Sequence, residues 1–301
     1  FIDYSFFLNP GTDVSLEGGG QISYGSNNVN GIDNPLFCNI SSSNYTLAGN
    51  SPCLGSGQNG ENIGAFDVGC GNVFKNYYVS VDAQENGNGS LDAPFMSIQN
   101  AINTVSDYDT ILVSEGIYGE NINYNGKNIV ITGENKETTI IDGGGQGSVV
   151  TFVNGEANST ILENLTIQNG ATNGDGGGIN CMYASPTLRN LIIQNNSSNS
   201  DGGGISCYFG SSPLVENVKI LNNIAGWGGA FFCAEEESNP TLTNVLIAYN
   251  SGLNGAVCVW NDANPTFNHI TIANNGIYDN ELGLESGFHN EFSNRVVTIK
   301  N

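Results

Sequence analysis

The sequence is poor in positive charge. It has 7 Lys and Arg against 29 Asp and Glu in 301 residues, which gives a formal net charge of -22. Only 12% of the residues are charged, so the acidity comes from missing cations and not from acidic runs. Proteins that bind nucleic acid or anionic membranes need clustered Lys and Arg to neutralise phosphate. The sequence therefore predicts neither kind of partner.

Long apolar segments are also absent. No apolar run approaches the ~18 residues that a transmembrane helix needs, so the sequence predicts no membrane insertion. Seven cysteines are too few for a disulfide scaffold of this length. By contrast, 39% of the residues are apolar, which is enough for a core, and 41 glycines indicate many turns.

A repeat of about 26 residues runs through the sequence from residue 160 onward. Glycine-rich turns, prolines and cysteines each recur at this interval. The cysteines are Cys181, Cys207, Cys233 and Cys258, and the last of the three intervals is one position shorter than the others. One such repeat is too short to bury its own apolar side, so we expect successive repeats to stack as the coils of a solenoid.

Apolar residues alternate with variable ones inside each repeat. Leu191 and Ile193 illustrate this period of two, which is typical of a half-buried strand. Stacking brings equivalent residues about 4.8 Å apart, so apolar columns form a core and amide columns form hydrogen-bonded ladders. We expect the cysteines to form one such column, and a second column to contain Asn190, Asn217, Asn244 and His269. Helical repeats and propellers fit this spacing less well.

The segment before the repeats resembles a known family. Residues 77–80 (YYVS), 87–90 (GNGS), 94–102 (PFMSIQNAI) and 109–113 (DTILV) are similar to the entry segment of secreted right-handed parallel β-helix proteins of the pectin-lyase-like superfamily. The resemblance implies an all-β, right-handed parallel β-helix, with a short capping helix near residues 95–103. It implies little about function, because this fold supports lyases, hydrolases, adhesins and structural proteins.

The resemblance also suggests how the chain is divided. We expect a parallel β-helix over residues 77–301, with a cap over 77–108 and coils over 109–301. Residues 1–76 lack the repeat and resemble a segment that closes a β-helix. The chain is then either a piece that straddles two domains or a unit whose segment 1–76 completes a neighbouring copy. We favour the second interpretation, which predicts head-to-tail association of copies through residues 1–76 and the C-terminal coils.

Charged residues of the repeats give two candidate features. Asp175 and Asp201 precede two glycine runs one coil apart and are candidate calcium ligands, although carboxylates that cap turns are the simpler interpretation. Arg189 stands one coil before Glu216, which predicts an ion pair between coils and not a catalytic base. No Ser/His/Asp set and no Cys/His metal spacing is present.

Aromatic residues and cysteines give two more candidate features. Tyr183, Phe209 and Trp260 each lie two residues after a repeat cysteine, and they form either a strip that stacks on sugars or a stack within the fold. The four repeat cysteines are expected to be stacked, buried thiols, because parallel Cβ vectors disfavour disulfides. A disulfide is expected instead within the loop-rich first segment, among Cys38, Cys53 and Cys70.

Together these patterns favour an extracellular or cell-surface structural or adhesive protein that forms filaments of stacked β-helices. The alternatives are a polysaccharide lyase, a glycoside hydrolase or a glycan-binding module without catalysis. No group of residues indicates catalysis more strongly than a structural role, so the sequence favours a protein that is not an enzyme. Calcium is the one cofactor to be considered, and the expected partners are other copies of the chain and glycans.

Overall fold

The computed structural model describes residues 74–276 continuously. It also describes residues 6–7, 29–30, 37–39, 44–49, 51, 53–54, 68–70, 288–290 and 298–300. The chain divides into two compact units, Phe1–Phe74 and Lys75–Asn301. The expected boundary at residues 76 and 77 therefore lies two residues after the observed one.

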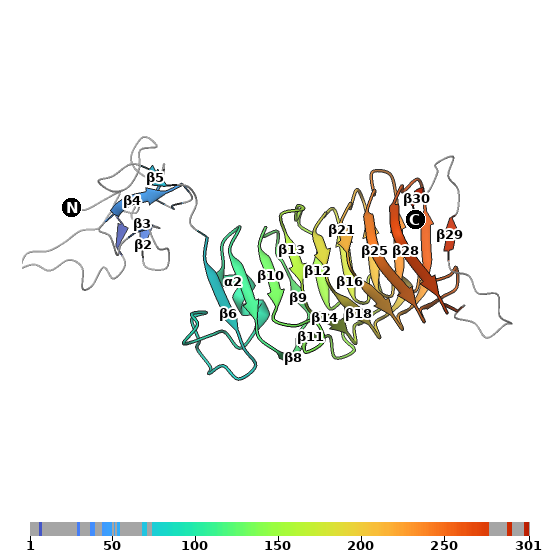
Figure 1. Cartoon of the computed structure of the whole chain (residues 1–301), viewed down its shortest axis with the longest axis horizontal. Helices are drawn as coiled ribbons and strands as arrows, with labels where there is room; N and C mark the ends of the chain where they lie inside the picture. The colour runs from blue at the N-terminus through green and yellow to red at the C-terminus, as the bar shows by residue number, and fades with distance from the viewer. Residues whose placement is uncertain are drawn as a thin grey trace, which may run out of the picture. The chain divides into compact units, whose positions relative to one another are not determined.

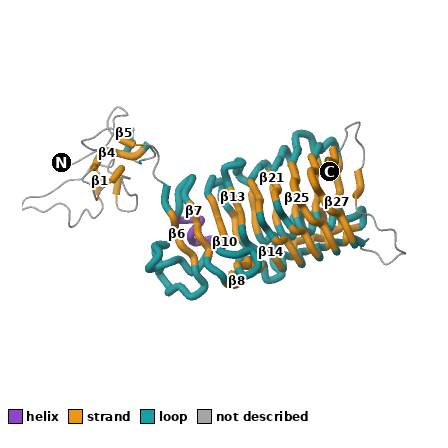
Figure 2. The backbone as a smooth tube through the Cα atoms, in the orientation of Figure 1, coloured by secondary structure: helices purple, strands orange, loops and turns teal. Residues whose placement is uncertain are grey.

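The second unit is a parallel β-solenoid whose coils stack one on the next (Figures 1 and 2). One series of strands consists of β6 (Asn76–Val79), β7 (Thr110–Val113), β10 (Val130–Gly133), β13 (Ile161–Glu163), β17 (Thr187–Arg189), β21 (Leu214–Glu216), β25 (Thr241–Ala248), β28 (Thr266–Ala273) and β30 (Thr298–Lys300). A second series joins it through β25, and comprises β8 (Gly116–Gly119), β11 (Thr139–Asp142), β14 (Thr166–Gln168), β18 (Ile192–Gln194) and β22 (Lys219–Leu221).

Two further sheets form the remaining sides of the solenoid, and the smaller one is confined to four coils among the described residues. The seven-stranded sheet consists of β9 (Ile122–Asn123), β12 (Val150–Phe152), β16 (Ile179–Met182), β20 (Ile205–Tyr208), β24 (Phe231–Ala234), β27 (Val257–Trp260) and β29 (Phe288–Asn290). The four-stranded sheet consists of β15 (Ala171–Thr172), β19 (Ser197–Asp201), β23 (Ile224–Trp227) and β26 (Ser251–Gly252).

The register between coils follows the sequence repeat. Ile179 pairs with Ile205 of the next coil, and Ile205 pairs with Phe231 after the same interval along the chain. Every strand pair of this solenoid in the described residues is parallel, apart from isolated bridges in turns. The prediction of an all-β parallel β-helix whose coils match the length of the sequence repeat is confirmed.

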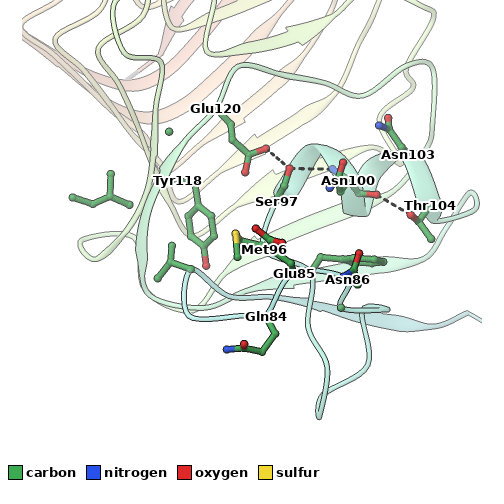
Figure 3. A pocket seen from close by; sticks show the side chains of 15 residues that line it. Gln84, Glu85, Asn86, Met96, Ser97, Asn100, Asn103, Thr104, Tyr118 and Glu120 are labelled. Atoms are coloured by element: carbon green, nitrogen blue, oxygen red, sulfur yellow. Dashed lines mark hydrogen bonds between the residues drawn. The ribbon is translucent and has the colours of Figure 1, made fainter.

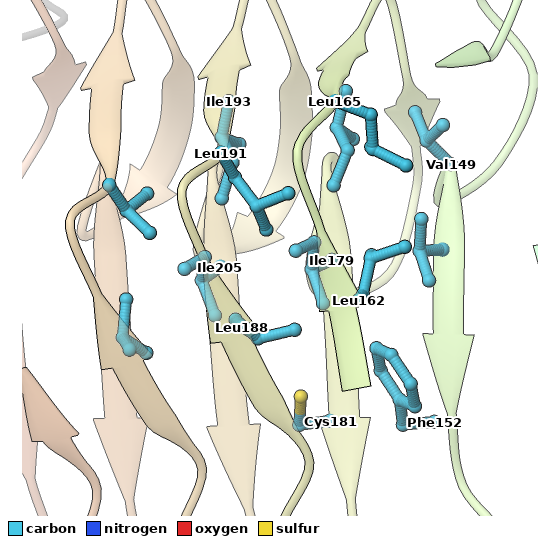
Figure 4. Packing of buried hydrophobic residues seen from close by; sticks show 14 of the residues in the cluster. Val149, Phe152, Leu162, Leu165, Ile179, Cys181, Leu188, Leu191, Ile193 and Ile205 are labelled. Atoms are coloured by element: carbon cyan, nitrogen blue, oxygen red, sulfur yellow. The ribbon is translucent and has the colours of Figure 1, made fainter. Parts of the chain in front are cut away.

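The core consists of apolar columns that run along the inside of the coils (Figure 4). Leu188, Leu191 and Ile193 of one coil are fully buried, as the period-two pattern predicts. Leu188 pairs with Leu162 on one side and with Val215 on the other, so each side chain packs against a similar one above and below. The core thus extends through every coil as one cluster.

A short helix covers the N-terminal end of this core. Helix α2 (Ile98–Thr104) begins three residues later than the segment expected at 95–103. The Ser97 hydroxyl oxygen accepts a hydrogen bond from the backbone N–H of Asn100, which caps the helix. Ile98, Ala101 and Ile102 are fully buried, so the predicted apolar face is confirmed.

The glycine runs are needed where two coils approach closely. Gly202 has a φ of 65°, a conformation that side chains with a Cβ disfavour. Gly203 faces a second constraint, because a Cβ there would lie 2.5 Å from the Gly229 carbonyl oxygen of the next coil.

A buried ladder of asparagines links the coils at one turn. It contains Asn196, Asn223, Asn250 and Asn275, which are all nearly inaccessible to solvent. The Asn223 side chain donates to Asn250 Oδ1 and to the Ile193 carbonyl, each at 3.0 Å, and its Oδ1 accepts from both the backbone and the side-chain nitrogen of Asn196. Every polar atom of this amide is therefore satisfied inside the fold.

The predicted column of Asn190, Asn217, Asn244 and His269 lies at another turn and differs from a continuous ladder. All four residues adopt a left-handed conformation, with φ between 52° and 56°, which Asn tolerates well. Asn190 donates to Asn164, and Asn244 donates to Asn217 at 2.7 Å. No side-chain hydrogen bond joins Asn217 to Asn190 or His269 to Asn244 among the described residues.

The described residues of the first unit form five short strands: β1 (Phe6–Phe7), β2 (Val29–Asn30), β3 (Phe37–Asn39), β4 (Asn44–Ala48) and β5 (Val68–Cys70). A disulfide joins Cys38 to Cys70, with an S–S distance of 2.01 Å. Cys53 is buried beside Leu47 and remains a thiol. Of the three cysteines predicted to supply a disulfide, Cys38 and Cys70 form it.

The buried ladder gives the first prediction. Asn223→Ala should lower the free energy of unfolding by roughly 2–4 kcal/mol, because it leaves several buried groups of neighbouring coils without partners. Asn217→Gly should cost about 1 kcal/mol or less, because Asn217 is exposed, Gly keeps its left-handed conformation, and Asn244 loses one acceptor. Urea unfolding of both variants measures the difference. Equal losses would contradict the distinction between the two columns.

Candidate functional site

An apolar cluster lies outside the solenoid, on the outer side of the seven-stranded sheet. Phe232 of β24 is fully buried although it points away from the core, and it packs with Ala234 and Cys258. Tyr208, Trp227 and Trp260 cover this cluster and are half-buried themselves. We call these residues, together with Tyr183 and Phe209, the aromatic face.

The sequence of β24 explains why this strand is buried on both sides. Its residues are Phe231, Phe232, Cys233 and Ala234, so apolar side chains point alternately into the core and out of it. The Phe232 ring lies 5.3 Å from the Tyr208 ring, measured between centroids. Trp227, which comes from β23 of the neighbouring sheet, lies 5.4 Å from Trp260 in an edge-to-face arrangement.

A pair of stacked rings extends the face at the adjoining turn. Tyr183 and Phe209 are nearly parallel, at 13°, with centroids 5.0 Å apart. Their φ values of 56° and 53° are unusual for bulky residues. The Tyr183 side chain is 61% exposed and that of Phe209 38%, so the turn presents aromatic surface to solvent.

Trp260 reaches the face from a different position than expected. It pairs with Ala234 on the strand, so the residue equivalent to Tyr183 and Phe209 in this coil is Asn261. Trp260 therefore does not continue the stack of Tyr183 and Phe209, since the coil from Cys233 to Cys258 is one residue shorter.

The same shortened coil changes the cysteine column. Cys181, Cys207 and Cys233 pair in register inside the core, but Cys233 pairs with Val259 in the next coil. Cys258 pairs instead with Phe232 and lies outside, in the aromatic face. Its predicted place in the column is therefore wrong, because a shift of one residue along a strand moves a side chain to the other side of the sheet.

The inner cysteines are buried thiols, as predicted. Their side-chain hydrogen bond and burial raise the pKa of the Cys181 thiol well above its ordinary value, and burial also raises the pKa of Cys207 and Cys233. Thiols held in the neutral form are poor nucleophiles and poor metal ligands. This column therefore serves packing.

A carboxylate borders the aromatic face. The Tyr208 hydroxyl donates a hydrogen bond to Asp201, which belongs to β19. Burial raises the pKa of Asp201, and the charge of Asp175 raises it further, while hydrogen bonds from Tyr208 and Ser200 oppose the shift. Burial and the charge of Asp201 likewise raise the pKa of the Tyr208 hydroxyl.

Asp175 and Asp201 thus interact electrostatically, as their equivalent positions imply. No group of three or more His, Cys, Asp and Glu that suits a metal ion occurs in the described residues. Calcium would therefore need backbone carbonyls or water in addition to these two carboxylates. Calcium binding at Asp175 and Asp201 stays a prediction.

Arg189 forms an ion pair with Glu163 of the preceding coil. The sequence predicts a pair with Glu216, which does face Arg189 in the register of β17 and β21. The hydrogen bond with Glu163 raises the pKa of Arg189, and Glu216 contributes more weakly. The guanidinium is thus held between two carboxylates, which supports an ion pair between coils.

A groove of about 830 Å³ lies beside the capping helix, where the sequence indicates no site (Figure 3). The Glu120 carboxylate forms one wall and accepts hydrogen bonds from the Ser97 hydroxyl and from the backbone N–H groups of Ile98 and Gln99. Its charge thereby stabilises the start of α2. Glu85 also lines the groove, but the Glu120 carboxylate is committed to the start of the helix through its three hydrogen bonds.

The aromatic face therefore has the best combination of features for binding a ligand. It offers apolar ring surface for stacking and a carboxylate for hydrogen bonding at the border. The signal in the sequence is the pair of successive phenylalanines that begins β24, which the repeat analysis did not single out. No helix in the described part of the chain is long and apolar enough to cross a membrane.

Two carboxylates with opposite pKa shifts give the second prediction. Since the folded pKa of Asp201 is raised, wild-type protein should lose stability relative to Asp201→Asn as pH rises above the ordinary Asp value of about 3.9. Asp142 is the matched control: burial alone would raise its pKa, but hydrogen bonds from Gln168, Gly144 and Asn169 outweigh burial and lower it. Asp142→Asn should therefore destabilise the protein at neutral pH. Thermal melts of both variants between acidic and neutral pH test this, and shifts of the same sign would contradict it.

Comparison with known proteins gives structural similarities only. No protein-family model matches the sequence, and no curated protein matches it. Among solved structures, pectin methylesterase PemA from Erwinia chrysanthemi is 13% identical, with a TM-score of 0.42, over 66% of this chain and 79% of that chain. A pectin methylesterase from carrot is 12% identical, with a TM-score of 0.37, over 74% of this chain and 86% of that chain. No activity is transferred from these proteins to this chain.

Proposed function

We propose that this chain binds a polysaccharide along its aromatic face. The observation that carries the proposal is the set of contacting rings outside the solenoid, from Tyr183 and Phe209 through Tyr208 to Phe232. An aromatic surface that is partly exposed and rigid suits stacking against sugar rings. Because its residues come from successive coils, the surface runs along the solenoid axis, which suits a linear polymer.

The charge around the face indicates the kind of polymer. Asp175, Asp201 and Glu235 all act on the Tyr208 hydroxyl, so the surroundings are negative. The negative charge would repel a polyuronate. The hydroxyl groups of a neutral polysaccharide would instead donate hydrogen bonds to the carboxylates. We therefore expect a neutral polysaccharide.

The third prediction tests this binding. Tyr183→Ala should weaken binding to a neutral polysaccharide by about two- to tenfold, because an aromatic contact contributes about 0.5–1.5 kcal/mol. Tyr249→Ala is the matched control, since its ring is 60% exposed, against 61% for Tyr183, but lies outside the face. Calorimetric titration with glucans, mannans and a polyuronate gives the affinities. Equal losses for both variants, or a preference for the polyuronate that Tyr183→Ala removes, would refute the proposal.

A second candidate function is hydrolysis of the bound polysaccharide. The observation that favours it is the raised pKa of Asp201 beside Asp175, at the border of the same face. A carboxylic acid with a raised pKa can protonate a leaving glycosidic oxygen, and a second carboxylate can activate water or act as nucleophile. Each of these residues would then contact substrate.

The fourth prediction separates catalysis from binding alone. If Asp201 is the acid, reducing ends should accumulate with wild-type protein, and Asp201→Asn should lower the rate at least about 100-fold while the polymer still binds. Asp142→Asn serves as the control, because its carboxylate lies in another strand series. Unchanged turnover in Asp201→Asn would exclude Asp201 as the acid, and no turnover with wild-type protein would leave a binding protein without this activity.

Head-to-tail assembly through residues 1–76 and the C-terminal coils stays a prediction, as does an extracellular location. Much of both segments lies outside the described residues, including 55–67 and 277–287. Sedimentation measured over a range of protein concentrations would test the assembly, since a filament-forming contact gives no fixed stoichiometry.

A further inference from the structure

A small groove of about 240 Å³ lies at the turn between β21 and β22, and we call it the lysine groove. It is lined by Lys136, Asn217, Val218, Lys219, Asn244, Val245, Leu246, His269 and Thr271. None of these residues is acidic. The chain has 29 Asp and Glu but only 7 Lys and Arg and 2 His, so a lining with two lysines and a histidine is an unusual concentration of cations.

We call the series of Asn190, Asn217, Asn244 and His269 the outer asparagine column. Lys136 interrupts this column at the groove. Its ammonium donates a hydrogen bond of 2.6 Å to Asn190 Oδ1, which is the acceptor that Asn217 would use in a continuous ladder. Asn190 itself donates to Asn164, and Asn244 donates to Asn217. The Nδ2 group of Asn217 therefore has no acceptor among the described residues.

Lys219 adds a second unused donor. It lies on β22 at a position that is exposed, and the one salt bridge among the described residues is that of Arg189 with Glu163. Lys ammonium groups and the amide Nδ2 group can only donate hydrogen bonds. The groove thus offers donors and positive charge with no carboxylate to compensate them.

We propose that the lysine groove binds a single oxyanion: a carboxylate, sulfate or phosphate group. Charge-assisted hydrogen bonds from Lys136 and Lys219 would hold the anion, and the Asn217 amide would supply a directed neutral donor. Glu137 and Glu216 adjoin groove residues in the chain without lining the groove, and Arg189 offsets part of the charge of Glu163 and Glu216. The site lies at a turn of the first strand series and is independent of the aromatic face, so either proposal can fail without the other.

The fifth prediction uses the side-chain amide of Asn217 as a reporter. Titration of labelled protein with inorganic sulfate, at constant ionic strength, should shift its NMR signals saturably, and Asn217→Asp identifies those signals by removing them. Lys219→Gln should weaken the affinity at least about threefold, and the Lys136→Gln/Lys219→Gln double variant should abolish saturation. Methyl glucoside, which is neutral, should cause no shift.

The controls decide whether the site is specific. Lys75→Gln removes the same charge outside the groove and should leave the affinity unchanged. Equal weakening by Lys75→Gln and Lys219→Gln, or no saturable shift at Asn217, would overturn the proposal. If the groove binds anions, the choice of probe identifies the class of ligand. Tighter binding of glucuronate than of acetate indicates that the ligand is an anionic sugar, and equal binding indicates a free anion. Melting temperatures close to wild type show that the variants remain folded.

Discussion

The constant register between successive coils is the constraint on which this structure depends. Each strand pairs with the equivalent strand of the next coil, so a side chain meets its own counterpart about 4.8 Å away. Apolar positions such as Leu188 and Val215 then pack against one another and form the core. A buried polar residue needs hydrogen-bond partners, and in the series from Asn196 to Asn275 the next coil supplies them by repeating the residue.

The same register organises the outer surface, and the candidate sites lie where a column changes. Phe232 stands between Ser206 and Cys258, so a large outward ring is flanked by smaller side chains that neighbouring aromatics cover. Lys136 enters the outer asparagine column and takes an acceptor from Asn217. Regular columns stabilise the solenoid, whereas departures from them expose rings or donors that a ligand can use.

The scarcity of cations makes their positions informative. Lys127 donates to the carbonyl oxygens of Ile102, Asn103 and Val105 and so satisfies the C-terminal end of α2. Arg189 is held by Glu163. Lys136 and Lys219 instead share a groove that has no acidic lining. Lys127 and Arg189 thus serve the fold, whereas Lys219 and the two remaining N–H groups of Lys136 are available to a ligand.

The sequence by itself determined the β-helix, because stacked coils require a fixed period and Leu191, Ile193 and the glycine runs display it directly. It also determined the inner thiols from Cys181 to Cys233 and the apolar face of α2. Only the tertiary structure decided that Cys258 points outward, since removing one residue from a coil reverses the side on which a strand residue lies. It alone also brought Lys136 to Asn190, 54 positions later. A contact between a loop and a distant coil leaves no trace in the repeat, because the repeat records only which residues stand in equivalent positions.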